Sequence, residues 1–268
     1  MATTRIALED LPAAVLAEIE AHTGPLLKVE PATEGFNSEI AARVCTERGS
    51  VYVKGLRAEH PRAWAQRREA EVNPFLPGIT PALRWRIESA EWDLLGFEAL
   101  EGHHADYSPE SPDVPKVASL LARLGEVPCP DIDLRQAEQR LERYAATPGD
   151  LDFFAGGSLL HTDLNNANVL VDDTAQLVDW AWATRGAAWL DAGYWVIWLM
   201  AAGGHSPQSA EGWASKIPAW HSAPPAGVTA FAVANANVWE EIGGDAPDPW
   251  TVRLVTASKS WATYRQTV

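Results

Sequence analysis

The sequence predicts an α+β protein with a β-rich N-terminal part and a mainly helical C-terminal part. Short apolar runs separated by turn residues dominate positions 1–101, prolines at 109, 112 and 115 mark a loop, and helical periodicity prevails from there to the end of the sequence. A length of 268 residues suits one large domain or two small ones. Hydrophobic residues make up 47% and charged residues 21%, which argues against extensive disorder. We expect two lobes, 1–101 and 102–268, with a ligand cleft between them.

The N-terminal lobe is predicted to be a small antiparallel sheet with one inserted helix. Leu11, Val15, Leu16 and Ile19 recur at helical spacing and predict an opening helix. Turn signals and alternating apolar residues predict five strands, at 26–29, 40–45, 51–53, 82–87 and 91–100. The inserted helix is expected over 60–76, where Pro74 and Pro77 end it.

The C-terminal lobe is predicted to be helical around one hairpin. Helices are expected over 117–124 and 134–144, and again from Trp189 onward. Between them, two β-like runs at 168–171 and 176–178 flank an Asp172-Asp173 turn.

Charge and cysteine content exclude several classes of protein. With 21 Lys and Arg against 36 Asp and Glu, the formal charge of −15 argues against nucleic acid or an anionic membrane as a partner. That charge either favours a cationic ligand or serves solubility. Two cysteines, Cys45 and Cys129, are too few for a disulfide framework. The first residues do not have the pattern of a signal peptide, and the longest apolar stretch, at 192–202, is too short to span a bilayer. We therefore expect a cytoplasmic protein, and oligomeric state stays open.

The segment HTDLNNANVLVDDTAQLVDW, at 161–180, carries the strongest chemical signal. Phosphoryl transfer needs a carboxylate that orients and deprotonates a hydroxyl, together with oxygen ligands that hold Mg²⁺ against nucleotide phosphates. Asp163 supplies the first group, and Asn168 and Asp179 supply the ligands. His161 is expected to brace the loop. The alternative is a structural histidine followed by a turn-capping carboxylate.

The pattern H-x-D-L-x-x-x-N followed by V-D-W resembles the aminoglycoside phosphotransferase family, whose members are protein-kinase-like enzymes acting on small molecules. The resemblance covers roughly residues 30–200 and implies a two-lobe kinase-like fold. It implies that Lys54 binds nucleotide phosphates and pairs with Glu69, for which Glu71 is a rival. It also implies that Asp191, in WLDAGYW, supports the catalytic loop.

The same resemblance implies two further nucleotide contacts. Gly35, Asn37 and Ser38 lie in the turn TEGFNSE, where the family covers the phosphates. The run FEALEG resembles the family's hinge, so the Glu98 carbonyl and the Leu100 amide would bind the adenine edge, with Phe97 behind it.

The implied activity is transfer of the γ-phosphate of ATP or GTP, with Mg²⁺, to a hydroxyl of a small molecule, with an antibiotic of aminoglycoside, nucleoside or peptide type as the expected acceptor. One alternative is a metabolic kinase of a sugar, amino alcohol or nucleoside. Another is a nucleotide-binding scaffold without transfer activity, against which the joint presence of Asp163 and Asn168 counts.

Tryptophan and acidic residues in the C-terminal lobe allow two interpretations each. Ten of the 13 tryptophans lie at 180–261, and helical spacing favours core packing over ligand contact for most of them. By the same resemblance, the region that forms the acceptor wall in the family contains Trp213, Trp220 and Trp239, whose rings could stack on a ligand ring or hold a cation. The acidic residues Glu240, Glu241, Asp245 and Asp248 either attract an amine or form a solvated helix end.

Overall fold

The computed structural model describes residues 4–32 and 37–268 and divides into two compact units. The first unit runs to Gly102 and includes Leu177–Ala181, whereas the second comprises His103–Gln176 and Trp182–Val268. This division differs from the expected lobes 1–101 and 102–268 mainly because Leu177–Ala181 groups with the N-terminal unit. The Leu177 amide donates a hydrogen bond of 2.8 Å to the Ile79 carbonyl there. Among the described residues, none of the helices combines the length and apolarity that a membrane crossing requires.

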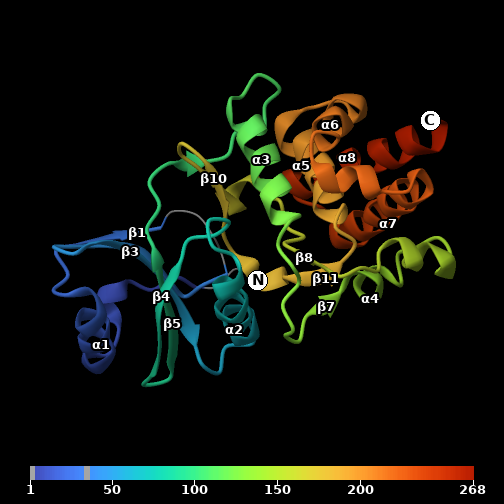
Figure 1. The fold of residues 1–268 in the computed structure, drawn as a ribbon. Coiled ribbons are helices and arrows are strands. Elements are labelled where there is room, and N and C mark those ends of the chain that lie inside the picture. The colour runs from blue at the N-terminus through green and yellow to red at the C-terminus, as the bar shows by residue number, and fades with distance from the viewer. Residues whose placement is uncertain (1–3, 33–36) are drawn as a thin grey trace. The chain divides into compact units, whose positions relative to one another are not determined.

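The N-terminal unit is built on a five-stranded sheet in which every neighbouring pair is antiparallel (Figure 1). The strand order is β1-β2-β3-β5-β4, with bounds β1 (Lys28–Pro31), β2 (Ile40–Thr46), β3 (Gly49–Arg57), β4 (Leu83–Ser89) and β5 (Trp92–Glu98). Helix α1 (Ala13–Thr23) precedes the sheet, and α2 (Ala63–Val72) is inserted between β3 and β4. The helix expected over 60–76 is therefore shorter, because the chain changes to a 3₁₀ turn at Asn73–Phe75, where Pro74 lacks a donor amide.

Apolar side chains of α1 cover one part of the sheet. Val15 and Ile19 are fully buried and share a core cluster with Ile40 of β2, Val44 of β2 and Leu94 of β5. The α1 residues repeat four apart, which places both on one helix face. At Gly96 of β5, an added Cβ would lie 2.1 Å from the Trp85 ring. Only glycine therefore leaves room for the Trp85 indole against the backbone of this strand.

The C-terminal unit combines two three-stranded sheets with six helices in the part of the chain that the structure describes. The first sheet has the order β10-β9-β6, formed by β6 (His103–His104), β9 (Val169–Val171) and β10 (Ala175–Leu177). The second has the order β7-β11-β8, formed by β7 (Arg135–Gln136), β8 (Ser158–Leu160) and β11 (Thr184–Gly186). The helices are α3 (Asp113–Leu124), α4 (Ala137–Leu141), α5 (Leu190–Gly203), α6 (Pro207–Ala214), α7 (Pro225–Gly243) and α8 (Pro249–Thr267).

The helix expected over 134–144 is only partly present. Arg135 and Gln136 pair with Thr184 and Arg185 of β11 and form β7, so the helix begins at Ala137. Strand pairing between residues 49 positions apart in sequence overrides the local helical pattern.

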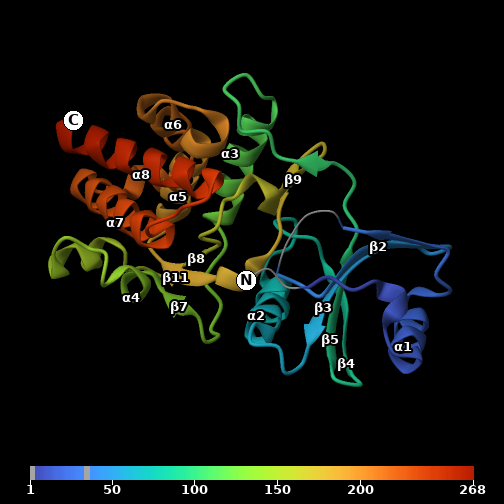
Figure 2. The same ribbon diagram turned by 180° about the vertical axis from the view of Figure 1, so that it is seen from behind.

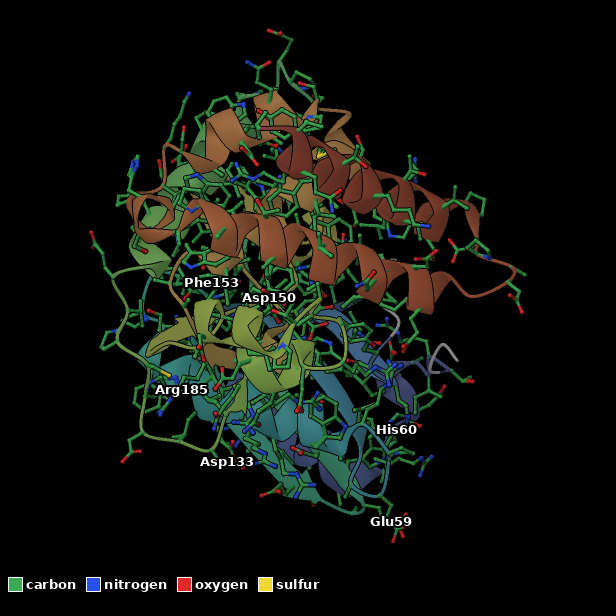
Figure 3. The ribbon with its side chains drawn as sticks, turned by 90° about the vertical axis from the view of Figure 1, so that its right-hand side faces the viewer. Glu59, His60, Asp133, Asp150, Phe153 and Arg185 are labelled. Carbon is green, nitrogen blue, oxygen red and sulfur yellow. The ribbon has the colours of Figure 1, made fainter. Side chains whose placement is uncertain are left out.

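Helices α5, α7 and α8 enclose an aromatic core, and Figures 1 and 2 show these helices side by side. Phe231 of α7 lies at its centre and meets the rings of Tyr194 and Trp261 edge to face, with centroids 4.9 and 6.2 Å away. Phe153, labelled with Asp150 in Figure 3, belongs to a 3₁₀ turn that packs on α7 at Gly227, where an added Cβ would come within 3.1 Å of the Phe153 side chain. Much of the tryptophan content therefore serves packing.

Candidate active site

The loop His161–Asn165 follows β8 and is held by one buried carboxylate. Asp191, near the start of α5 and 4% exposed, accepts hydrogen bonds of 2.8 Å from the backbone amides of His161 and Thr162. Thr162 has φ +69°, a left-handed conformation that costs a β-branched residue free energy and therefore needs such support. Burial raises the pKa of Asp191, and the two amide bonds oppose that shift. Asp191 thus contacts the backbone of the loop for which the sequence analysis expects it to be a support.

His161 is completely buried and acts on the loop through one ring nitrogen. Its Nδ1 accepts a hydrogen bond of 3.3 Å from the Asp163 amide. An accepting Nδ1 carries no proton, so the imidazole holds the backbone of Asp163 in place and lies too deep to meet a substrate.

Asp163 and Asn168 are brought together by the 3₁₀ turn Asn166–Asn168, which leads into β9. The Asn168 Nδ2 donates to Asp163 Oδ2 at 2.9 Å and to the Asp163 carbonyl at 3.2 Å. With the amide nitrogen used in this way, the Oδ1 of Asn168 is the atom left to bind a metal ion. Both side chains are half-buried, so the carboxylate keeps access to a ligand.

Two residues that sequence reasoning missed also hold the loop. The Tyr107 hydroxyl, in a side chain 2% exposed, donates 3.0 Å to the carbonyl of Leu164, the residue after Asp163. Arg140 of α4 donates through Nη1 to the hydroxyls of Thr162, at 2.7 Å, and Thr184, at 2.6 Å. These partners lie 57, 22 and 44 positions away in sequence, so no local motif could have pointed to them.

The N-terminal unit brings three charged residues together. Lys54 Nζ of β3 lies 2.6 Å from Glu69 Oε2 of α2 and 3.7 Å from Asp179 Oδ1. The Lys54 and Glu69 side chains are 16% and 6% exposed. Burial opposes the charge on Lys54, but the two carboxylates outweigh it and raise the pKa of that ammonium group. A lysine held charged in this way is suited to binding phosphate oxygens.

Helix α2 selects Glu69 over Glu71. Its buried positions Ala63, Gln66, Glu69 and Val72 recur every three residues, whereas Glu71 is exposed. The rival pairing is therefore absent, and Gln66 beside Glu69 is tied to β5 through the Asp93 carbonyl.

The residues expected to contact nucleotide at the turn and the hinge lie in the same unit. Gly35 is outside the described residues. Asn37 is exposed and accepts a hydrogen bond from Arg62 at the start of α2, while Ser38 is buried. Phe97 is buried in β5, which ends at Glu98, and Leu100 follows without regular secondary structure.

A cavity of about 400 Å³ lies within the C-terminal unit and includes Asp163 in its wall. Ligand pockets commonly have this size. Its other walls come from α4, α5, α7 and the segment before β11. The described residues that line it are Arg140, Leu141, Tyr144, Thr162, Asp163, Trp182, Tyr194, Ile197, Trp198, Asn235, Val238, Trp239 and Ile242. Trp213 and Trp220, expected as possible acceptor contacts, are not among them.

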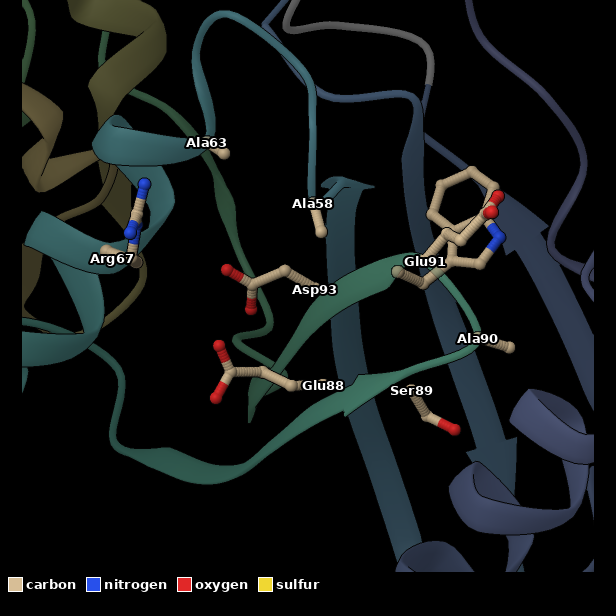
Figure 4. Close-up of a pocket in the computed structure, with 9 residues that line it drawn as sticks. Ala58, Ala63, Arg67, Glu88, Ser89, Ala90, Glu91 and Asp93 are labelled. Atoms are coloured by element: carbon tan, nitrogen blue, oxygen red, sulfur yellow. The ribbon is translucent and has the colours of Figure 1, made fainter.

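A second cavity, of about 330 Å³, lies in the N-terminal unit at the β4–β5 turn and α2 (Figure 4). None of the expected site residues lines it. Figure 4 shows the Asp93 and Glu88 carboxylates on the same side of the hairpin as Arg67, and Arg86 Nη2 binds both carboxylates, at 2.8 and 2.9 Å. Two of its acidic groups, Glu88 and Asp93, are thus engaged in structural ion pairs.

No protein-family model matches this sequence, and neither does any curated protein sequence. Solved structures do match its fold. An aminoglycoside phosphotransferase in ternary complex with AMP-PNP and hygromycin B superposes with a TM-score of 0.62 at 14% identity, covering 93% of this chain and 99% of that one. The chain has a protein-kinase-like fold. The choline kinase LicA from Streptococcus pneumoniae gives 0.61 at 13% identity, covering 94% and 99%. The macrolide 2′-phosphotransferase MphH from Brachybacterium faecium gives 0.52 at 18%, covering 91% and 97%.

The fold expected from the sequence, α+β with an antiparallel N-lobe and a helical C-lobe, is confirmed by these superpositions. At such identities the likeness concerns the fold. Function has to be argued from the side chains.

Proposed function

We propose that this protein is a small-molecule O-phosphotransferase that transfers the γ-phosphate of ATP or GTP to an acceptor hydroxyl. The observation that carries the proposal is Asp163, a carboxylate fixed by Asn168 at 2.9 Å in the wall of a ligand-sized cavity. Solved proteins of the same fold hold AMP, ADP or AMP-PNP, and some hold hygromycin B, which supports a nucleotide donor and a hydroxylated acceptor. An antibiotic is the acceptor class that the resemblance favours.

Asp163 would act on the acceptor. Its carboxylate orients the hydroxyl and takes its proton as the hydroxyl oxygen attacks the γ-phosphorus. The bond from phosphorus to the bridging oxygen breaks, and the nucleoside diphosphate leaves with that oxygen. Asn168 and His161 keep the carboxylate in place.

Lys54 would act on the donor. Its ammonium group, kept charged by Glu69 and Asp179, neutralises phosphate charge that would otherwise repel the attacking oxygen. We further propose that the turn with Asn37 and Ser38 covers the phosphates, and that the Glu98 carbonyl and Leu100 amide bind the base, with Phe97 behind it.

The donor set fits Mg²⁺. Asn168 Oδ1 and the Asp179 carboxylate are hard oxygen donors, and Mg²⁺ keeps several waters and binds few protein groups. When bound, the metal would neutralise phosphate charge. Among the described residues there is no cluster of three or more His, Cys, Asp or Glu side chains that could hold another kind of metal ion.

The test is phosphate transfer from radiolabelled ATP and GTP, with Mg²⁺, to a panel of alcohols that includes antibiotics, sugars and nucleosides. Asp163→Asn keeps the shape of the side chain and should lower turnover by roughly 10²- to 10⁴-fold while nucleotide still binds. Asp173→Asn, in the exposed turn after β9, is the matched control. Equal turnover in wild type and Asp163→Asn would exclude the proposed base. Nucleotide binding without transfer to any acceptor would favour the scaffold alternative.

A further inference from the structure

The cavity beside Asp163 has apolar walls. Trp182, Tyr194, Ile197, Trp198, Trp239 and Ile242 contribute rings and branched aliphatic chains to it. Such walls gain free energy by removing apolar ligand surface from water. Polar groups of a ligand that faced these six side chains would lose hydration without replacing it.

The charges that line the cavity do not suit an amine-rich ligand. Among its described lining residues, Asp163 is the one carboxylate and Arg140 is the one cation. The protein carries a formal charge of −15, but this excess lies elsewhere than in the cavity wall. A polyamine would therefore meet a single carboxylate and a nearby guanidinium.

The aromatic wall at Trp182 is already occupied by protein cations. The guanidinium carbon of Arg135 lies 4.6 Å from the ring centroid, and that of Arg140 lies 5.4 Å away. Cation–π attraction draws a cation to a ring face, and two arginines here repel a third positive charge. A ligand ammonium group gains little at this ring.

The deeper tryptophan wall is also committed to protein contacts. The Trp198 ring meets Trp239 edge to face at 6.2 Å and lies 5.6 Å from Trp250, over which Arg253 is placed at 4.6 Å. These rings form a packed apolar surface, which suits a ring system of the ligand.

Three of the four acidic residues near the end of α7, namely Glu240, Glu241 and Asp248, are engaged as well. Glu240 pairs with Lys259 at 2.6 Å, and Glu241 binds Arg143 and the Tyr144 hydroxyl. Asp248 caps α8 through the amides of Trp250 and Thr251. This arrangement favours the structural interpretation of the cluster that the sequence left open.

We propose that this cavity is the acceptor site and that it selects uncharged alcohols built on an aromatic or aliphatic ring system, in preference to polyamines and quaternary ammonium alcohols. The inference rests on the proposed phosphotransferase function and narrows its acceptor. Asn235 adds polar recognition: its Nδ2 donates to the Phe231 carbonyl at 3.0 Å, which leaves Oδ1 as an acceptor for a ligand hydroxyl.

The test is calorimetric titration of the full chain, without nucleotide, with 4-nitrophenyl β-D-glucoside, uridine, kanamycin and choline. We expect at least one of the two neutral ring alcohols to bind roughly tenfold or more tightly than kanamycin and choline. Tighter binding of kanamycin or choline would overturn the proposal. Absence of binding by both neutral probes at their highest soluble concentrations would also overturn it.

Substitutions in the cavity wall test whether the neutral probe binds in this cavity. Trp239→Ala should weaken the neutral probe by roughly tenfold or more, because an aromatic wall is lost. Trp213→Ala is the matched control, since Trp213 is likewise half-buried but lies on α6 under Lys216, outside the cavity lining. Ile242→Asp, at a side chain 57% exposed, should fold normally, weaken the neutral probe and strengthen kanamycin. Unchanged affinities in both Trp239→Ala and Ile242→Asp would place the binding elsewhere and refute the assignment.

Binding and transfer are read separately, so the two proposals can fail independently. Phosphate transfer to kanamycin with no transfer to neutral alcohols would keep the phosphotransferase function and overturn the selectivity. Neutral-probe binding that depends on Trp239, with no transfer to any alcohol, would keep the binding site and overturn the phosphotransferase function.

Discussion

Asn168 donates its side-chain amide to the carboxylate of Asp163 across 2.9 Å, within one turn of the chain. The bond holds Oδ2 of the Asp163 carboxylate against the turn that follows it. It also fixes the amide of Asn168, whose oxygen is the proposed metal ligand. One hydrogen bond thereby couples the proposed base to the proposed metal site.

Removing that bond should impair transfer. Asn168→Ala is expected to lower kcat by roughly tenfold to hundredfold, because a hydrogen bond to a charged group and the proposed metal ligand are lost together. Asn166→Ala, in the same 3₁₀ turn, is the control and should leave kcat within a factor of about two. Steady-state kinetics at saturating nucleotide measures the kcat of both variants. Equal effects of the two substitutions would contradict the assignment.

Tyr107 is expected to act as a positioning residue. In Tyr107→Phe the Leu164 carbonyl loses its 3.0 Å partner in a buried site, which should lower the free energy of unfolding by about 1 to 2 kcal/mol. The loop that carries Asp163 would loosen, so kcat should fall while the KM for nucleotide changes little. Tyr264→Phe, on α8, should alter neither quantity. Loss of stability with an unchanged kcat would assign Tyr107 a purely structural role.

The short-range parts of this molecule could be predicted from sequence. The five N-terminal strands follow alternating apolar residues between turns, and Asp163 and Asn168 sit five positions apart in a recognisable pattern. Lys54 and Glu69 could be named because β3 and α2 are adjacent in the chain. The choice between Glu69 and Glu71 needed the observed three-residue burial period of α2.

The parts of the structure that depend on long-range contacts could not be predicted from sequence. Strand β7 exists because Arg135 and Gln136 pair with β11, and the local pattern there reads as helix. Arg140 reaches Thr162 and Thr184 only once α4, the loop and β11 are folded together. The cavity beside Asp163 depends on which tryptophans face one another, and helical spacing alone does not reveal that.

The carboxylate of Asp191 should be required for the strained loop. Asp191→Asn replaces one of two accepting oxygens by an NH₂ group that faces a backbone amide, so at least one 2.8 Å bond is lost. The free energy of unfolding should fall by about 2 kcal/mol, and the amides of His161 and Thr162 should exchange with deuterium faster. Urea denaturation and hydrogen exchange measure these effects. Unchanged protection of the two amides would show that other contacts hold Thr162 in its left-handed conformation.

The ion pair of Lys54 with Glu69 should leave a signature in the pH dependence of stability. Breaking it with Glu69→Gln at neutral pH should cost about 3 kcal/mol, since a buried ammonium group loses its main partner. The pKa of Lys54 is raised above 10.5 in the folded protein, so the unfolded chain releases this proton first as pH rises. The resulting stabilisation is fully present below about pH 10.5, and it is lost as the pH rises through the raised pKa of Lys54.

The difference in unfolding free energy between wild type and Glu69→Gln should therefore narrow when urea denaturation is followed from about pH 8 to about pH 11. Glu30→Gln is the matched control, because it breaks the pair of Lys28 with Glu30, whose side chains are 67% and 44% exposed. Solvent screens that pair, so its removal should change stability little at any of these pH values. Parallel curves for wild type and Glu69→Gln would mean that Glu69 does not control the charge of Lys54.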